Sequence, residues 1–148
     1  MSARTKRLVR VTDVRQEALD REQGEYGRAL QEQERCRQEV RRAQERVEEA
    51  RAERLRASGD FSIEEWRSKE AWLTELVRRV DLASAAALQQ EDVVEQARAR
   101  VAAAKTLVEQ MNVVLERVSQ EENRARTAQE NKDEDELASS RWIAASKA

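Results

Sequence analysis

Apolar residues recur every seven positions through the second half of the chain. The series starts at Trp66 and continues without a polar member through Leu73, Val80, Ala87, Val94, Val101, Val108 and Leu115. A companion position three residues after each of these is apolar except at Lys69 and Gln90. Alternating steps of three and four residues form the apolar seam of a coiled-coil helix. The pattern therefore predicts one long helix over about residues 63–140.

The first half carries a weaker seam of the same kind, which predicts a helix over about residues 3–57. Its members are Leu19, Tyr26, Gln33, Val40 and Val47, and the companion positions are Ala29, Cys36, Ala43, Ala50 and Ala57. Before Leu19 the apolar stripe moves by one place, to Val11, Val14 and Ala18. That shift predicts a break in the phase of the seam near the start of this helix.

The two predicted helices are separated by a clear local break. Ser58 and Gly59 are typical of a helix C-terminus, and Ser62 with Glu65 three residues later forms a capping box that starts the next helix. The turn is therefore expected over residues 58–62. Helices joined by so short a connection bury their seams by folding back on each other, which predicts an antiparallel hairpin.

The hairpin also predicts which residues face each other. If the numbers of facing residues add up to 123, small side chains mostly meet large ones, as in Ala50 with Leu73 and Ala29 with Val94, and Val47 faces Leu76. Such pairs suit a tightly packed two-helix seam. The match worsens toward the open end, where Glu22 would face Val101 and Arg15 would face Val108, so the seam is expected to fray there.

The same register places Gln33 opposite Gln90. Two seam amides that hydrogen-bond to each other lower stability but penalise slipped alignments, so the pair is interpreted as a register lock. The alternative is that both glutamines occupy a solvated rim by chance.

The predicted fold is all-α: a single antiparallel two-helix coiled-coil hairpin spanning residues 1–148, with an overhanging C-terminal helix. The second helix is expected to outreach the first, because it is longer. Its last part then has no partner within the chain, which leaves four apolar side chains free: Leu137, Ala138, Trp142 and Ile143.

Composition argues against several classes of function. Charged residues make up 39% of the chain and aromatic residues 3%, so little core is available to shelter an active site. The chain has no histidine, no glycine-rich phosphate loop and no cysteine cluster, so no catalytic residue, cofactor or metal site is expected. Cys36 is interpreted as a small seam residue. A net charge of −2 argues against nucleic acid, and no stretch is apolar enough for membrane insertion.

Two terminal segments resemble a known family. The start "KRLVRVTDVRQEALDREQGEY" and the end "ERVSQEENRARTAQENKDEDELASSRW", together with the break near residue 60, resemble the FliJ/YscO family of type III export stalk proteins. The resemblance implies a cytoplasmic protein, peripheral at the base of a membrane export apparatus and monomeric on its own. It also implies insertion into a hexameric export ATPase, a hairpin tip directed at the cytoplasmic domain of the export gate, and, in some members, contact with export chaperones.

The resemblance also assigns residues to the two ends. The end that faces the export gate would comprise Phe61, Ile63, Trp66, Trp72 and Leu73. The end that faces the ATPase would comprise Arg4, Lys6, Arg7, Arg10, Asp135, Glu136, Leu137 and Trp142.

Two questions stay open at the level of sequence. The competing function is a structural or adaptor coiled coil, in which two chains pair through the same seams as a homodimeric spacer. The sequence also does not separate a flagellar from a virulence-associated export system.

Overall fold

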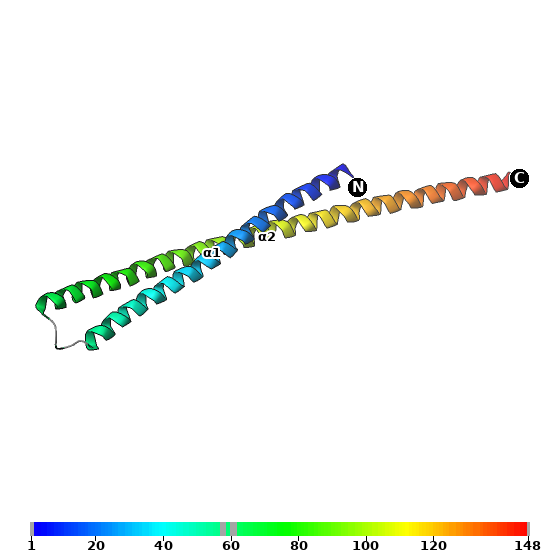
Figure 1. The fold of residues 1–148 in the computed structure, drawn as a ribbon. Helices are drawn as coiled ribbons and strands as arrows, with labels where there is room; N and C mark the ends of the chain where they lie inside the picture. Colours follow the sequence, from blue (N-terminus) through cyan, green and yellow to red (C-terminus); the bar gives the residue numbers. More distant parts are fainter. Residues whose placement is uncertain (1, 57–58, 60–61, 148) are drawn as a thin grey trace. The chain divides into compact units, whose positions relative to one another are not determined.

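The structure is a computed structural model that describes residues 2–56, 59 and 62–147. Within these ranges the chain forms two helices and no strand: α1 (Ala3–Arg56) and α2 (Ile63–Ser146) (Figure 1). The two long helices pack against each other, which confirms the predicted all-α class and is consistent with a coiled-coil hairpin.

Serine side chains cap the start of both helices. The hydroxyl of Ser2 accepts a hydrogen bond of 3.1 Å from the backbone N–H of Thr5, and the hydroxyl of Ser62 accepts one of 3.2 Å from the N–H of Glu65. Each bond satisfies a backbone donor that the first turn of a helix leaves unpaired. Glu64 and Glu65 in the first turn of α2 also suit the positive end of the helix dipole.

The connection between the helices contains Gly59, whose φ is +130°. Only glycine adopts this backbone conformation without strain, which explains the residue type at this turn. Ala57 and Ser58, which the sequence assigns to the end of the first helix, lie outside the described residues.

The seam of α2 lies where the heptad pattern predicts it. Over residues 73–118, every member of the seven-residue series and every companion position is buried or half-buried, Gln90 included. Over residues 19–50, the same holds for the seam of α1. Trp66 and Lys69, at the start of the α2 series, are exposed.

The predicted break in phase near the start of α1 is wrong. Val11 and Val14 are exposed, whereas Thr5 is buried and Leu8 and Thr12 are half-buried. The heptad count of the rest of α1 therefore continues at Thr5, Leu8 and Thr12, although Arg15 is exposed and Ala18 is half-buried. Thr12 fits into the seam because its hydroxyl donates to the Leu8 carbonyl at 2.8 Å, which removes the penalty for burying an unpaired polar group.

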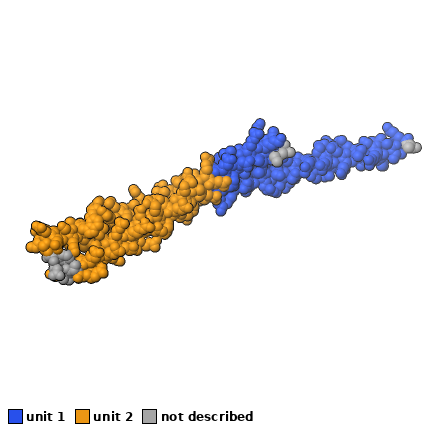
Figure 2. Space-filling view, viewed as in Figure 1, with its two compact units in different colours: residues 1–19, 104–148 blue, residues 20–103 orange. Residues whose placement is uncertain are grey.

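The described chain divides into two compact units, shown in different colours in Figure 2. Unit 1 comprises Met1–Leu19 and Ala104–Ala148, and unit 2 comprises Asp20–Ala103. Each unit contains one part of α1 and one part of α2.

In unit 2 the two helices pair in antiparallel fashion. Arg54, near the end of α1, forms an ion pair with Glu70, near the start of α2, whereas Glu22 pairs with Arg100. The core joins Ala29 to Val94 and Ala97, and Tyr26 packs against it. Ala29 with Val94 and Tyr26 with Ala97 are pairs whose numbers add up to 123, so the contacts agree with the predicted register.

In unit 1 the start of α1 also pairs in antiparallel fashion with α2. Arg4 lies 4.0 Å from the carboxylate of Glu121, and the hydroxyl of Thr5 donates to Glu122 at 2.8 Å. Leu19, Val108 and Val118 are buried in this unit. Arg15, the expected neighbour of Val108, is exposed, so its charge remains in water.

Candidate functional site

The grooves between α1 and α2 in unit 2 are shallow, and charged side chains form part of their lining. One groove in unit 2 lies between α1 and α2, where Glu34, Arg37 and Arg41 of α1 meet Leu88 and Glu91 of α2. Such a surface does not exclude water from a reacting group. Among the described residues, no group of three or more His, Cys, Asp or Glu side chains is placed to hold a metal ion.

The first candidate surface lies at the start of α2. Ile63 is 74% exposed and Trp72 is 51% exposed, whereas Leu73 is half-buried in the seam. Phe61, which completes the predicted gate-facing set, lies outside the described residues. Two large apolar side chains thus face water near the start of α2.

Trp66 in the same region is held by a residue that the sequence analysis missed. The guanidinium of Arg54 lies 3.9 Å from the centre of the Trp66 ring and forms an ion pair of 2.5 Å with Glu70. Arg54 is one heptad step beyond Val47, so the seam count alone places it opposite the start of α2. Trp66 therefore helps to hold α1 and α2 together, while part of its ring remains exposed.

Trp72 has a neighbouring network on α2 itself. Arg79 lies 5.1 Å from the centre of its ring and also contacts the carboxylate of Glu75. The hydrogen bond from Arg78 is the main cause that lowers the pKa of Glu75 to about 2, with Arg79 adding to the effect. Glu75 therefore stays ionised at neutral pH and pairs with Arg79, the arginine that lies beside the Trp72 ring.

The second candidate surface combines the start of α1 with the last turns of α2. Arg4, Lys6, Arg7 and Arg10 are all exposed on α1. The structure does not bring them to the acidic and apolar residues with which the sequence analysis groups them. Arg4 contacts Glu121, and Asp135 follows fourteen residues later on α2, a rise of about 21 Å along the helix.

A small polar cluster fixes the start of α1 to α2. The hydroxyls of Ser2 and Thr5 both donate to the carboxylate of Glu122. These two hydrogen bonds, with that from Ser2 the larger cause, lower the pKa of Glu122. Thr5 and Glu122 continue the seven-residue series of the α1 and α2 seams. These heptad positions could have predicted the contact between the two residues.

The two glutamines of the proposed register lock are both half-buried. Gln90 donates its side-chain N–H to the backbone carbonyl of Ala29 at 3.0 Å. Within the described ranges, no hydrogen bond joins Gln33 to Gln90. Any contribution of Gln90 to register therefore acts through the main chain of α1 and not through a second amide.

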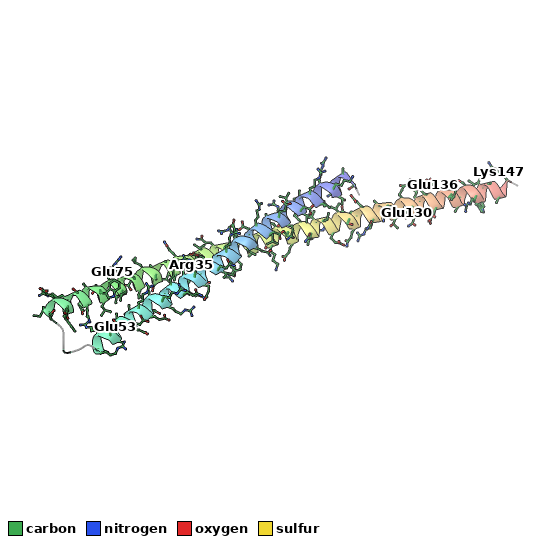
Figure 3. The ribbon with its side chains drawn as sticks, viewed as in Figure 1. Arg35, Glu53, Glu75, Glu130, Glu136 and Lys147 are labelled. Atoms are coloured by element: carbon green, nitrogen blue, oxygen red, sulfur yellow. The ribbon has the colours of Figure 1, made fainter. Side chains whose placement is uncertain are left out.

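The last part of α2 makes no buried contact. Every residue over 123–147 is exposed, and Figure 3 shows Glu130, Glu136 and Lys147 on this segment. Trp142 is 72% exposed and lines a shallow groove with Ala138, Ser139 and Ile143. Of the residues assigned to the ATPase-facing end, Asp135, Glu136, Leu137 and Trp142 lie in this segment.

None of the described helices has a stretch long and apolar enough to cross a membrane. No curated protein and no solved structure matches the chain. A family model described as "Flagellar FliJ protein" matches residues 5–147, which is nearly the whole sequence. The chain therefore belongs to the FliJ family, whose members are components of flagellar and type III export apparatus.

Proposed function

We propose that this protein is the central stalk of a type III export ATPase complex. It inserts into the hexameric ATPase, promotes assembly and activity of the hexamer, and links the hexamer to the export gate. The observation that carries the proposal is the FliJ family match over residues 5–147, in a chain whose two helices pair along one seam.

The ATPase-facing end is formed by the last part of α2. This segment overhangs the paired part of the hairpin, so all sides of it are free to contact the walls of a pore. The exposure of every residue over 123–147 supports this assignment. Asp135 and Glu136 provide charge for this contact, and Leu137 and Trp142 provide apolar area. The basic residues of α1 contact the rim of the ATPase pore; these are Arg4, Lys6, Arg7 and Arg10.

The gate-facing end is formed by the start of α2. Trp72 and Ile63 are its anchors, because exposed aromatic and aliphatic side chains supply most of the binding energy in protein interfaces. Trp66 and Leu73 support them from the edge of the seam, and Phe61 belongs to the same set.

The protein acts on the ATPase without catalysing a reaction itself. A stalk changes hydrolysis by shifting the hexamer toward its assembled and active state, and it can do so only by binding that state more tightly. This role places the protein in the cytoplasm, peripheral to the membrane, and leaves its charged surface available to export chaperones.

Addition of the pure chain to its cognate ATPase tests the proposal. We expect faster ATP hydrolysis and more hexamer. Deletion of residues 137–148 should reduce both effects, whereas Trp72→Ala should leave them intact and weaken binding to the gate domain. Absence of stimulation at saturating concentration would refute the stalk role.

The spacer hypothesis receives less support. A homodimeric spacer needs the seams of α1 and α2 for pairing between chains, but these seams are already buried against each other within one chain.

A further inference from the structure

Unit 1 has an exposed apolar face beside its seam. The contact between Arg4 and Glu121 marks one side of the helix pair. Because α1 and α2 are antiparallel, steps of three and four residues forward on α1 and backward on α2 stay on that side. These steps define the apolar face, which consists of Val11, Val14 and the half-buried Ala18 on α1 and Leu107, Val113 and Val114 on α2.

The apolar face is not used by the fold. Val14 and Val113 are 59% and 56% exposed, and Val11, Leu107 and Val114 are each at least 38% exposed. The seam of unit 1 is formed by other residues, such as Val108 and Val118. Apolar area of this extent gains free energy when another surface covers it.

Unpaired arginines stand at one end of the apolar face. Arg7 and Arg10 lie one turn before Val11 and Val14 on α1, and Arg117 lies one turn after Val113 on α2. All three are exposed, and none has an ion pair among the described residues. Glu121 at the same end is paired with Arg4. The surface therefore changes from basic to apolar in the direction of falling residue number on α2.

The last part of α2 has the complementary order. It first presents a run of carboxylates and then a group of apolar side chains: Asp133, Glu134, Asp135 and Glu136, followed by Leu137, Trp142 and Ile143. All are exposed, and Figure 3 shows Glu136 on this segment. Glu134, Asp135 and Glu136 have no ion pair in the part of the chain that the structure describes. This segment changes from acidic to apolar in the direction of rising residue number.

We propose that the apolar face of unit 1 binds the C-terminal part of α2 from a second copy of this chain, with the two α2 helices antiparallel. Only this orientation sets the basic end of the apolar face beside the carboxylates of the C-terminal segment and the apolar part of each beside the other. It sets residues 133–136 of one copy beside Arg7, Arg10 and Arg117 of the other, and Leu137 and Ile143 beside Val113 and Leu107.

The antiparallel orientation is also the one that closes a dimer. A two-fold axis between the copies makes the same contact twice, so each copy both offers and receives a C-terminal segment. Direct contact between the two apolar faces would instead leave the arginines of both copies and the carboxylates of residues 133–136 without partners of opposite charge. The charge pattern therefore favours the exchanged arrangement.

The proposed dimer does not depend on the stalk function, but it would regulate that function. It covers Leu137 and Trp142, which we assign to the ATPase-facing end, so the same segment serves two competing partners. The sequence analysis predicts a monomer. That prediction then applies to dilute solution, because the fraction of dimer rises with protein concentration.

Sedimentation equilibrium of the full chain tests the dimer. From about 1 to about 500 µM at low salt, the mass should rise from 17.1 kDa toward twice that value, and high salt should weaken association. The face variant Arg7→Glu/Arg10→Glu and the tail variant Glu134→Arg/Glu136→Arg should each weaken dimerisation about tenfold or more.

A mixture of the face variant and the tail variant is the decisive sample. In the mixed dimer, the acidic face of one chain meets the basic tail of the other, and the unaltered face and tail meet as in the native pair. Association should therefore recover in the mixture. Helix content by circular dichroism checks that both variants fold.

The matched control is Arg42→Glu/Arg46→Glu, which reverses two exposed arginines of α1 in unit 2 and should leave association unchanged. A mass of 17.1 kDa over the whole range would overturn the proposal. So would a mixture that associates no more than its components, or a dimer that persists in both charge variants.

Discussion

At the scale of single residues, the seam tolerates polar side chains wherever their hydrogen-bonding groups find partners. Thr12 and Gln90 each donate to a backbone carbonyl, and Thr5 donates to the carboxylate of Glu122. A buried polar group with a partner costs little, whereas the same group without one is strongly destabilising.

Replacement of Gln33 and Gln90 by leucine should raise the melting temperature, because two polar seam positions become apolar. The same variant should lose uniqueness of register, since no side chain then binds the Ala29 carbonyl. Thermal unfolding followed by circular dichroism measures the first effect. The mass in dilute solution, where the native chain is expected to be a monomer, measures the second. Gln89→Leu on the exposed side is the control, and a lower melting temperature in the double variant would show that the facing assignment is wrong.

Removal of the Arg54 side chain should release Trp66. We expect Arg54→Ala to destabilise the helix pair by about 1 kcal/mol, which is the order of a partly exposed cation–π contact. The emission of Trp66 should also shift toward that of a solvated indole. The measurement uses a chain with Trp72→Phe and Trp142→Phe, so that Trp66 is the only emitter. An unchanged spectrum would mean that Arg54 does not cover the ring.

Acid should release the start of α1. The pKa of Glu122 is lowered in the folded chain, so its stabilising effect is complete above the ordinary carboxyl pKa of 4.5 and is lost as the pH falls through the lowered value. We expect the amide protection factors of residues 5–8, which are exchange rates corrected for the intrinsic effect of pH, to fall over that range. Glu122→Gln should show low protection already at neutral pH and no further loss of protection with acid. Equal pH dependence in both proteins would contradict this role for Glu122.

At the scale of helices, the seven-residue pattern was sufficient to predict both seams and their antiparallel register. It failed at the start of α1, because Val11 and Val14 look like better seam residues than Thr5 and Thr12. The choice depends on hydroxyl partners supplied by the helix backbone and by α2, and these partners are not visible in a pattern of apolar positions. The contact of Arg54 with Trp66 was missed for a similar reason, since long polar side chains cross between helices.

The seams should carry most of the stability of the helices. Leu76 is 3% exposed, so Leu76→Ala should lower the free energy of unfolding by about 2 kcal/mol or more through loss of burial and a residual cavity. Leu82→Ala is the matched control, because Leu82 is 56% exposed on the same helix. Urea unfolding of both variants compares them directly. Similar losses in the two variants would place the seam on the wrong face of α2.

At the scale of the whole molecule, family membership and helix pairing within one chain point to the same class of function. The sequence was sufficient to indicate both, because heptad spacing and the terminal segments are local features. The contact residues of the two ends could not be predicted to the same degree. They depend on partners, and an exposed side chain on a helix carries no packing constraint that identifies its neighbour.

Pairing within one chain has a direct covalent test. Cysteines introduced by Val47→Cys and Leu76→Cys, in a chain with Cys36→Ala, should form an intrachain disulfide on mild oxidation, because both positions are buried in the seam of unit 2. Non-reducing electrophoresis should show a compact monomer. Covalent dimers as the main product would support the spacer hypothesis. Val47→Cys with Leu82→Cys is the control that should not close.

The exposure of all residues over 123–147 also determines how this segment behaves before it meets a partner. No tertiary contact holds these turns, so their helicity rests on intrinsic propensity and on local pairs such as Arg126 with Glu130. Isolated helices of this length are only marginally stable in water, and their ends fray first. Warming should therefore melt this segment well before the seams separate, and whatever captures it at higher temperature must supply the free energy needed to rebuild its turns.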